Sequence, residues 1–495
     1  MRFLYYIVVL FLVCGFCGCD GTVIDEVSKN LSSYEIIATL DYENKTLSAV
    51  ENVVYKNNSD VALSELKFHL YPNAFSEKAT LYKCVNQAQS SRVYKNGFSE
   101  GNIEITSVNV DNKACEFAIS GEDRNILVIT LEESIAPSFQ TKLNISFNLT
   151  IPNCEHRFGY GDNTLSLGNW YPIACVFEGG GFLTDGYSPN GDPFYSEVAN
   201  YCVTLTYPSK LTMVSTGILN QVSSERDLTT SVYEAKAVRD FACVFSEKFE
   251  SKSAPVGDTT LSYFYYDDND FEKHFQVCID ALNTFNAMFG EYPYPVLNVA
   301  KANFFQGGME YPQLVYISDS IDTESEIVNV IVHEISHQWW YGVVGNNECE
   351  NAWIDEGLAE YSTALFYDKN PSYGKTSREV IDSALSSYLL FADVYNDVYD
   401  EFDTSMNRNI HNFKTETEYV YLTYVKGVLM FDSVCDIIGK PNMEKSLQRL
   451  YSDNMFSNVK PVDVIAAFES TTHKKLASYI GSWLDGSVVF EELNG

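Results

Sequence analysis

Two histidines and the glutamate between them stand at spacings that can build a metal site. His333, Glu334 and His337 form the pattern H-E-x-x-H inside an apolar stretch, residues 327–340. In a helix, His333 and His337 lie one turn apart on the same face, so their imidazoles point toward one ion. Two imidazoles suit Zn²⁺, and Glu334 can reach a water bound to that ion. The pattern is complete in a chain with only seven histidines, which favours a metal site over a hydrogen-bonded pair of core histidines.

Glu356 is the predicted third ligand. It follows His337 by 19 positions and stands in a second helical pattern that runs to residues 370–371. A His-His-Glu set leaves the fourth zinc position for water, which is the arrangement of a catalytic and not of a structural site. Gly357 lets another backbone come close. Glu360, one turn beyond Glu356, either orients a zinc-bound histidine or faces solvent.

The elements that position these residues predict an α+β chain. From residue 32 to residue 254, short runs rich in β-branched and aromatic residues, such as 36–42 and 201–207, are separated by turn signals. This texture is typical of an antiparallel β domain. A composition shift near residues 252–258 marks the expected boundary, and a second domain takes residues 255–495.

The second domain begins with a strand pair and continues as helices. The expected strands cover residues 261–266 and 296–304, and they flank a helix at 271–288. The helix with the two histidines begins at a capping box, in which Thr323 is followed three positions later by Glu326. Gly342 can end it.

The composition restricts the partners. Lys plus Arg number 33 against 67 Asp plus Glu, a formal net charge of −34, and a nucleic acid is repelled by such a surface. The acidic field is compatible with cationic peptides. The chain has twelve cysteines, three of them within the first nineteen residues, and the other nine are scattered without a C-x-x-C pair. They indicate buried small side chains and not a thiolate zinc site, and one or two disulfides are the alternative.

The first nineteen residues predict a leader. Met1-Arg2 precedes an apolar run at residues 3–16, shorter than the roughly 20 residues that span a bilayer. Gly18 before Cys19 is typical of a bacterial lipoprotein signal, although Phe16 replaces the usual leucine. We therefore expect a leader at 1–19, a lipid anchor on Cys19 and an extracytoplasmic, membrane-anchored lipoprotein at the cell surface or in the periplasm. An ordinary cleaved signal or an uncleaved anchor is the alternative.

The motifs together resemble the aminopeptidase N family of zinc peptidases, which are gluzincins. H-E-I-S-H with W-I-D-E-G-L-A-E-Y at this separation is similar to the zinc pattern of the family, and residues 441–486 resemble the end of its catalytic domain. The resemblance implies a saddle-like antiparallel β domain followed by a thermolysin-like, mainly helical peptidase domain. It also implies one Zn²⁺ per chain and peptide substrates.

Two further site residues come from this resemblance. Gly307-Gly308-Met309-Glu310 looks like the exopeptidase signature of the family, in which Glu310 binds the free amino group of the substrate, although Tyr311 stands where Asn is usual. Tyr424, followed by Val425-Lys426-Gly427, is similar to the catalytic tyrosine that donates to the developing oxyanion. Tyr419 and Tyr421 are neighbouring candidates for the same role.

The resemblance thus implies a zinc aminopeptidase in which Glu334 activates the attacking water and Glu310 selects the amino end. A thermolysin-like endopeptidase with the same metal site is the alternative, and it predicts cleavage of amino-blocked peptides. A surface binding protein that has lost catalysis is a second alternative, disfavoured because ligands, base and tyrosine are all present. A structural module with a zinc staple is disfavoured because closed sites normally use four protein ligands.

Overall fold

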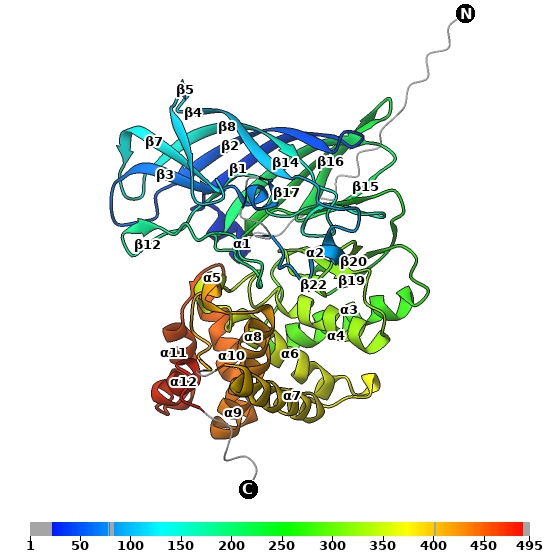
Figure 1. The fold of residues 1–495 in the computed structure, drawn as a ribbon, viewed down its shortest axis with the longest axis vertical. Coiled ribbons are helices and arrows are strands. Elements are labelled where there is room, and N and C mark those ends of the chain that lie inside the picture. Colours follow the sequence, from blue (N-terminus) through cyan, green and yellow to red (C-terminus); the bar gives the residue numbers. More distant parts are fainter. Residues whose placement is uncertain (1–21, 78, 80–83, 400–401, 489–495) are drawn as a thin grey trace, which may run out of the picture.

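The computed structural model describes residues 22–77, 79, 84–399 and 402–488. Its strands lie mostly in the amino-terminal half and its long helices in the carboxyl-terminal half, stacked along the long axis of the molecule (Figure 1). The described chain is therefore α+β, with a β-rich domain placed on a mainly helical one, as the sequence predicts.

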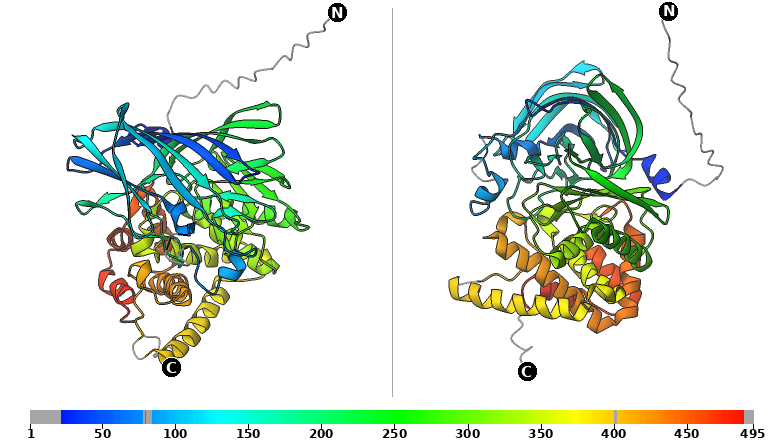
Figure 2. Two further views of the ribbon diagram at one scale, coloured as in Figure 1. Left: turned by 45° about the horizontal axis from the view of Figure 1, so that its top comes forward. Right: turned by 90° about the vertical axis from the view of Figure 1, so that its right-hand side faces the viewer.

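One curved eight-stranded sheet dominates the β domain and arches over its core (Figure 2). In spatial order its strands are β16 (Ile218–Glu225), β17 (Leu228–Val238), β14 (Ala199–Pro208), β1 (Ser33–Asp41), β2 (Thr46–Lys56), β8 (Gln140–Thr150), β4 (Asn102–Val110) and β5 (Lys113–Ala114). Alternate residues of β1 and β14 are buried, so these strands are amphipathic at the period of two that their sequences show. The sheet is antiparallel except that β1 and β14 run parallel, which the sequence did not indicate.

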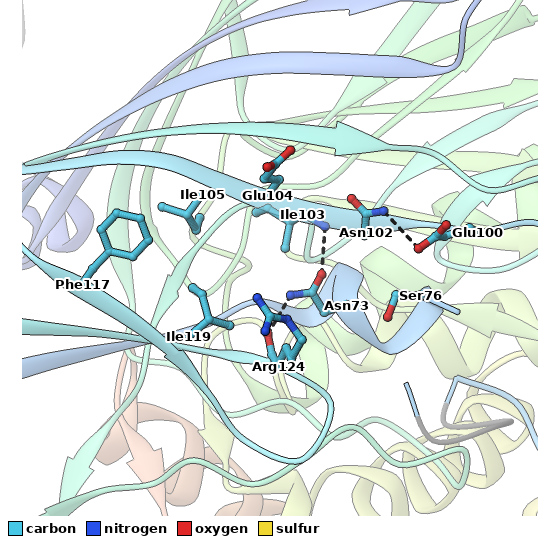
Figure 3. Close-up of a pocket in the computed structure, with 10 residues that line it drawn as sticks. All are labelled: Asn73, Ser76, Glu100, Asn102, Ile103, Glu104, Ile105, Phe117, Ile119 and Arg124. Atoms are coloured by element: carbon cyan, nitrogen blue, oxygen red, sulfur yellow. Dashed lines mark hydrogen bonds between the residues drawn. The ribbon is translucent and has the colours of Figure 1, made fainter. Parts of the chain in front are cut away.

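Shorter strands and two small helices complete this domain. One four-stranded sheet contains β15 (Thr212–Ser215), β18 (Cys243–Ser246), β10 (Leu165–Leu167) and β9 (Phe158–Tyr160), and the other contains β11 (Ile173–Ala174), β3 (Leu63–His69), β7 (Ile126–Ile135) and β6 (Phe117–Ser120). The remaining elements are β12 (Phe177–Glu178), β13 (Gly181–Phe182), α1 (Val23–Ser28), α2 (Ser90–Val93) and a 3₁₀ turn at Tyr71–Phe75. A hollow of about 440 Å³ lies between β4 and β6, where the Asn73 amide bonds the backbones of Ile103 and Arg124 (Figure 3).

A five-stranded sheet joins the β domain to the helices. Its order is β19 (Glu250–Val256), β20 (Thr259–Tyr265), β21 (Val296–Ala302), β23 (Leu314–Ser318) and β22 (Gly308–Met309). The pairs β20–β21 and β21–β23 are parallel, and α3 (Phe271–Phe289) makes the crossover between β20 and β21. Edge strand β22 pairs antiparallel with β23 and leads directly into Glu310.

The helical half supplies the elements below this sheet. They are α4 (Glu324–Ser336), α5 (Glu348–Asn351), α6 (Asp355–Lys369), α7 (Ser377–Val398), α8 (Glu416–Val420), α9 (Lys426–Ile438), α10 (Lys440–Asn454), α11 (Pro461–Thr472) and α12 (Ala477–Leu484). Strands β24 (Gly345–Asn346) and β25 (Asn458–Val459), 3₁₀ turns at Pro371–Tyr373 and Ile410–Asn412, and a π-helix at Tyr421–Val425 complete it.

Helix α4 ends earlier than predicted. Thr323 caps its start by accepting the Glu326 N–H, but the last helical residue is Ser336 and not a position near Gly342. The chain tightens there because the Gln338 N–H bonds the Ile335 carbonyl, in the i to i−3 pattern of a 3₁₀ turn. The early turn buries Gln338 completely beside β23 and β22.

A buried arginine fastens the two halves to each other. Arg239, directly after β17, is 2% exposed. Its guanidinium donates to the carbonyls of Tyr341 and Ser457, each at 2.6 Å, in the helical half, and to the carbonyl of Ser196 in the β half. Five N–H donors in a planar fork can satisfy several carbonyls at once, so the domains share one set of hydrogen bonds.

Nine cysteines fall in the described part of the chain, and all of them are free thiols, seven of them buried. The predicted lipid anchor, Cys19, and the leader lie outside the described residues. Within the described ranges, none of the helices has both the length and the apolarity that crossing a bilayer requires.

Candidate metal centre and active site

The two histidines of the H-E-x-x-H motif converge as their spacing predicts. His333 belongs to the last turn of α4 and His337 is its C-cap, with the His337 N–H bonded to the His333 carbonyl. Their Nε2 atoms lie 3.1 Å apart, and both side chains are buried. The early end of α4 therefore leaves the pair intact, because the turn between the two residues keeps its helical hydrogen bond.

Helix α6 brings Glu356 against this pair. The carboxylate oxygen Oε2 lies 3.3 Å from Nε2 of His333 and 3.3 Å from Nε2 of His337. No other group of three or more His, Cys, Asp or Glu side chains in the described ranges could hold a metal ion. Two imidazoles and one carboxylate, all directed at one point, are the kind and number of protein ligands that a catalytic zinc site uses. The residues present fit Zn²⁺.

The ionisation of Glu356 suits a cation. Burial raises the pKa of its carboxyl, but contacts with His333 and His337 outweigh burial and lower that pKa to about 2. A carboxylate that stays ionised is the form that binds a divalent metal.

Each histidine is also oriented through its outer nitrogen. His337 Nδ1 lies 2.9 Å from the carbonyl oxygen of Trp340, and His333 Nδ1 lies 3.0 Å from Oε1 of Glu360. Contacts of this kind fix the ring that a metal ligand presents. Of the two roles predicted for Glu360, the geometry supports the one in which it orients His333, although its side chain keeps 25% exposure.

Glu334 faces the same cleft and has an oxygen free for chemistry. Its Oε2 is buried without a hydrogen-bond partner, and burial raises the pKa of this carboxyl to about 7, with His333 and His337 acting in the opposite direction. Strand β22 passes so close that a Cβ at Gly308 would lie 2.5 Å from Cδ of Glu334. A side chain at Gly308 would displace the Glu334 carboxylate, and the close approach places Glu310 near the metal ligands.

Glu310 is 4% exposed and lines the same cleft. Its Oε1 has no hydrogen-bond partner. Burial and the nearby Asp192 carboxylate raise the pKa of Glu310 well above its ordinary value. An ammonium group is the partner that such a carboxylate lacks, because it supplies both N–H donors and positive charge.

Tyr311, which departs from the family signature, serves the domain boundary. It is fully buried, and its hydroxyl donates to Oδ1 of Asn169 in the β domain at 3.0 Å. A Cβ at Gly168 would collide with that hydroxyl, so Gly168 makes room for the tyrosine. Tyr311 thus holds the segment after Glu310 against the β domain, and it is not among the residues that line the cleft.

Tyr424 enters the cleft from the π-helix at Tyr421–Val425. Its hydroxyl donates to Oε1 of Glu356, and its ring stacks on His333 at a centroid distance of 5.9 Å. Tyr421, by contrast, stacks on Phe391 of α7, so the structure separates these two candidates. Tyr419 makes an edge contact with Tyr424 and does not line the cleft.

A contact between two glycines sets the position of Tyr424. A Cβ on Gly427 would lie 2.8 Å from Cα of Gly357, so α9 and α6 cross with their backbones almost touching. The close backbone expected at Gly357 is therefore the start of α9. Since Gly427 follows Tyr424 by one helical turn, this crossing brings the tyrosine over the ligand Glu356.

Sequence reasoning missed a fifth cleft carboxylate, Asp192. It comes from a loop of the β domain, and it is ion-paired with the buried guanidinium of Arg157. Arg157 also donates to Oε1 of Gln306, at 3.3 Å, next to the glycine pair before Glu310. Nothing local marks these residues, because only the fold brings a loop 118 positions upstream beside Glu310.

The assembled cleft encloses about 200 Å³. Its lining residues are Asp192, Gln306, Gly307, Gly308, Glu310, Asn329, Val330, His333, Glu334, His337, Glu356, Glu360 and Tyr424. All six residues predicted from the sequence to act in catalysis, metal binding or amine binding are among them.

Comparison with known proteins identifies the helical half. Residues 273–483 match the model of the Peptidase family M1 domain. Aminopeptidase M1-D of Oryza sativa is 24% identical over 219 residues, and aminopeptidase N of Lactobacillus delbrueckii is 24% identical over 217 residues. These matches cover 42% and 40% of this chain and 24% of each relative, so the chain matches about a quarter of the length of these relatives.

The fold has a close counterpart along nearly its whole length. An M1 zinc metallopeptidase from Deinococcus radiodurans superposes with a TM-score of 0.65 at 14% identity, covering 93% of this chain and 95% of that one. A mutant of that protein, solved with a Tyr-Ser-Ala substrate, matches equally well. The resemblance expected from the motifs is thereby confirmed: residues 273–483 match the Peptidase family M1 domain, and this part of the chain is similar to aminopeptidase N.

Proposed function

We propose that the protein is a zinc-dependent aminopeptidase that removes residues from the amino ends of peptides. One observation carries the proposal. A buried carboxylate without a partner, Glu310, lines the same small cleft as the His333, His337 and Glu356 cluster and the free oxygen of Glu334. A metal site and a base suffice for hydrolysis, and the extra carboxylate sets the register by pairing with a free amino terminus.

The roles of the residues follow from their places. His333, His337 and Glu356 would hold one Zn²⁺ per chain. When bound, the metal lowers the pKa of water and polarises the scissile carbonyl. Glu334 takes the proton of the attacking water and passes it to the leaving amine. The Tyr424 hydroxyl donates to the oxyanion as the carbonyl carbon becomes tetrahedral. Glu310 holds the substrate ammonium, so that the first peptide bond is the one in reach of Glu334.

Matched peptides test the proposal. The zinc-loaded protein, from about residue 20 onward, is incubated with one peptide bearing a free amino end and with the same peptide acetylated. Stepwise release from the free form alone supports an aminopeptidase. Cleavage of both forms identifies a thermolysin-like endopeptidase, and cleavage of neither favours a binding protein that has lost catalysis.

We further propose that the enzyme acts outside the cytoplasm, held to a membrane by a lipid on Cys19. The support is the apolar run at residues 3–16 followed by Gly18-Cys19. Mass spectrometry of the mature protein tests this directly. A diacylglycerol adduct on an amino-terminal Cys19, lost in Cys19→Ser, is the expected result, and an unmodified mature terminus contradicts it.

A further inference from the structure

A second hollow, which we name the junction pocket, lies where the β domain meets the catalytic domain. It encloses about 540 Å³ between α1, the β16–β17 hairpin and the loop 291–295 that precedes β21. The right-hand view of Figure 2 shows α1 at the side of the molecule, at the level where sheet and helices meet. The junction pocket shares no lining residue with the zinc cleft.

Its walls are apolar and aromatic. Tyr292 and Tyr294, which are 6% and 2% exposed, alternate with Pro293 and Pro295 along the loop. The Tyr294 hydroxyl donates to the Ala237 carbonyl at 2.6 Å, and that of Tyr292 contacts the Val296 carbonyl and Oε1 of Gln338, each at 3.3 Å. Because both hydroxyls are engaged by the protein, the tyrosines offer a ligand their ring carbons.

The polar groups of the pocket carry an excess of negative charge. Four carboxylates line it, and one cation, Lys236, is bonded to one of them, Asp25, at 2.8 Å. The other three carboxylates are Glu234, Asp258 and Glu291. A positively charged group with an apolar stem complements both the walls and these carboxylates.

An unsatisfied acceptor gives independent evidence for a donor ligand. Gln313 lines the pocket at 2% exposure, and its side-chain oxygen Oε1 has no hydrogen-bond partner. Buried amide oxygens are normally paired, because leaving one unpaired costs free energy. The hollow of Figure 3 differs, since its buried amide, Asn73, has both its oxygen and its nitrogen engaged by the protein backbone.

We propose that the junction pocket binds an alkylammonium group, as carried by a lysine side chain of a basic peptide. The butyl stem lies along the tyrosine and proline walls, and the ammonium group reaches Oε1 of Gln313 and the carboxylates. This site goes beyond the proposed peptidase activity, because it reads a side chain and needs no free amino terminus.

Hydrogen bonds also connect the junction pocket to the segment that contains Glu310. The Gln313 N–H donates to Oε1 of Gln338 at 2.8 Å. The Gln338 side-chain amide in turn donates to the carbonyls of Glu310 and Tyr311, at 3.4 and 3.1 Å. A ligand on Gln313 is therefore two hydrogen bonds away from the backbone of Glu310.

Calorimetric titration of the zinc-loaded protein with acetyl-Leu-Lys-Leu-amide tests the proposal. This probe has no free amino terminus, and a matched peptide with norleucine in place of lysine keeps the stem and removes the charge. We expect saturable binding of the lysine peptide, at least tenfold weaker binding of the norleucine peptide, and weaker binding as salt rises.

Variants locate the binding. Gln313→Leu keeps the backbone N–H that bonds Gln338 and removes the unpaired side-chain oxygen. Glu291→Gln changes an exposed loop residue, so the core stays unchanged. Each substitution should weaken binding of the lysine peptide by tenfold or more. Gln276→Leu, on the exposed surface of α3, is the matched control and should not change it. Three results overturn the proposal: absence of binding at millimolar peptide, equal affinity for the norleucine peptide, or binding that Glu310→Gln abolishes while Gln313→Leu leaves it intact.

Discussion

The Tyr424 hydroxyl donates a hydrogen bond to one oxygen of Glu356, and the other oxygen of that carboxylate faces both histidines of the metal site. One glutamate thus links the metal ligands to the residue that we expect to stabilise the oxyanion. The positions of Glu356 and Tyr424 relative to each other depend on the crossing of α6 and α9 at Gly357 and Gly427.

Removing the Tyr424 hydroxyl should slow the chemical step. In Tyr424→Phe the stack on His333 can remain while the donor is lost, so kcat should fall by about 10²–10³ with little change in KM. Steady-state kinetics on a free-amino peptide measure this. Tyr421→Phe is the matched control, because Tyr421 stacks on Phe391 outside the cleft; an equal loss in both variants contradicts the role of Tyr424.

Neutralising Glu334 should abolish turnover and leave the metal in place. Glu334→Gln removes the proton acceptor, and general-base catalysis contributes about 10²–10⁴ in rate. Zinc content by atomic absorption should stay at one per chain, because His333, His337 and Glu356 are unchanged. Glu326→Gln, on the exposed first turn of the same helix, should retain full activity. Substantial turnover by Glu334→Gln would exclude Glu334 as the base.

Glu310→Gln should reduce selection for the free amino end. Removing one charge of a buried ion pair costs about 2–5 kcal/mol of binding free energy. For peptides with a free amino end, this corresponds to a fall in kcat/KM of roughly 30-fold to several-thousand-fold. The ratio of free to acetylated peptide cleavage is the measurement. Glu272→Gln on the surface of α3 serves as the control. If Glu310→Gln leaves this ratio unchanged, Glu310 does not recognise the amino end of the substrate.

Gly427→Ala should damage stability and catalysis together. The added methyl group would lie 2.8 Å from Cα of Gly357, so α6 and α9 must separate. Overpacking of this kind costs about 1–3 kcal/mol, and Tyr424 moves away from Glu356. Urea unfolding and kcat report the two effects. Gly481→Ala in α12 meets no atom within 4 Å and should be neutral or slightly stabilising, as Ala favours helix over Gly.

His274 should make stability depend on pH near neutrality. Burial lowers its pKa, but Asp268 Oδ2 at 2.8 Å and Glu324 Oε2 at 3.2 Å outweigh burial and raise it above 6.5. A raised pKa means that the stabilisation is complete below about pH 6.5 and is lost as pH rises through the folded-state value. The two carboxylates have lowered pKa values, so their own contribution is lost only in acid, as pH falls below about 4.

The midpoint of urea unfolding between pH 6 and pH 9 tests this behaviour. His274→Gln should be less stable than the unaltered protein at pH 6, and the difference should shrink as pH rises. His473→Asn is the control, since His473 caps α11 in the left-handed conformation that Asn tolerates. A difference that stays constant across this range would show that folding does not raise the pKa of His274.

The sequence predicts the metal site better than the rest of the cleft for a physical reason. His333, Glu334 and His337 lie within one helical turn, and Glu356 begins the next long helix, so local periodicity alone gives their directions. Glu310 and Tyr424 rest on family resemblance, because a carboxylate beside a strand or one tyrosine among 34 carries no local signal.

Features that depend on tertiary packing could not be predicted from the sequence. The end of α4 at Ser336 follows from the burial of Gln338 against β23 and β22, and no cap residue marks it. The parallel pairing of β1 with β14 is a property of chain topology. Asp192 lines the cleft from a loop of the β domain and is ion-paired with Arg157, and neither residue carries a local sequence signal for this position.

The π-helical turn Tyr421–Val425 makes side-chain direction in the cleft sensitive to the number of residues in the chain. The Lys426 N–H bonds the Tyr421 carbonyl, an i to i−5 step that accommodates one residue more than an α-helical turn. Each residue of an α-helix turns the chain by about 100°. Deleting Leu422 would let this turn become regular, and it would rotate the chain before position 422 by about a quarter turn relative to Gly427. Single-residue insertions and deletions here therefore change the direction of every preceding side chain relative to α9, whereas substitutions at neighbouring positions do not.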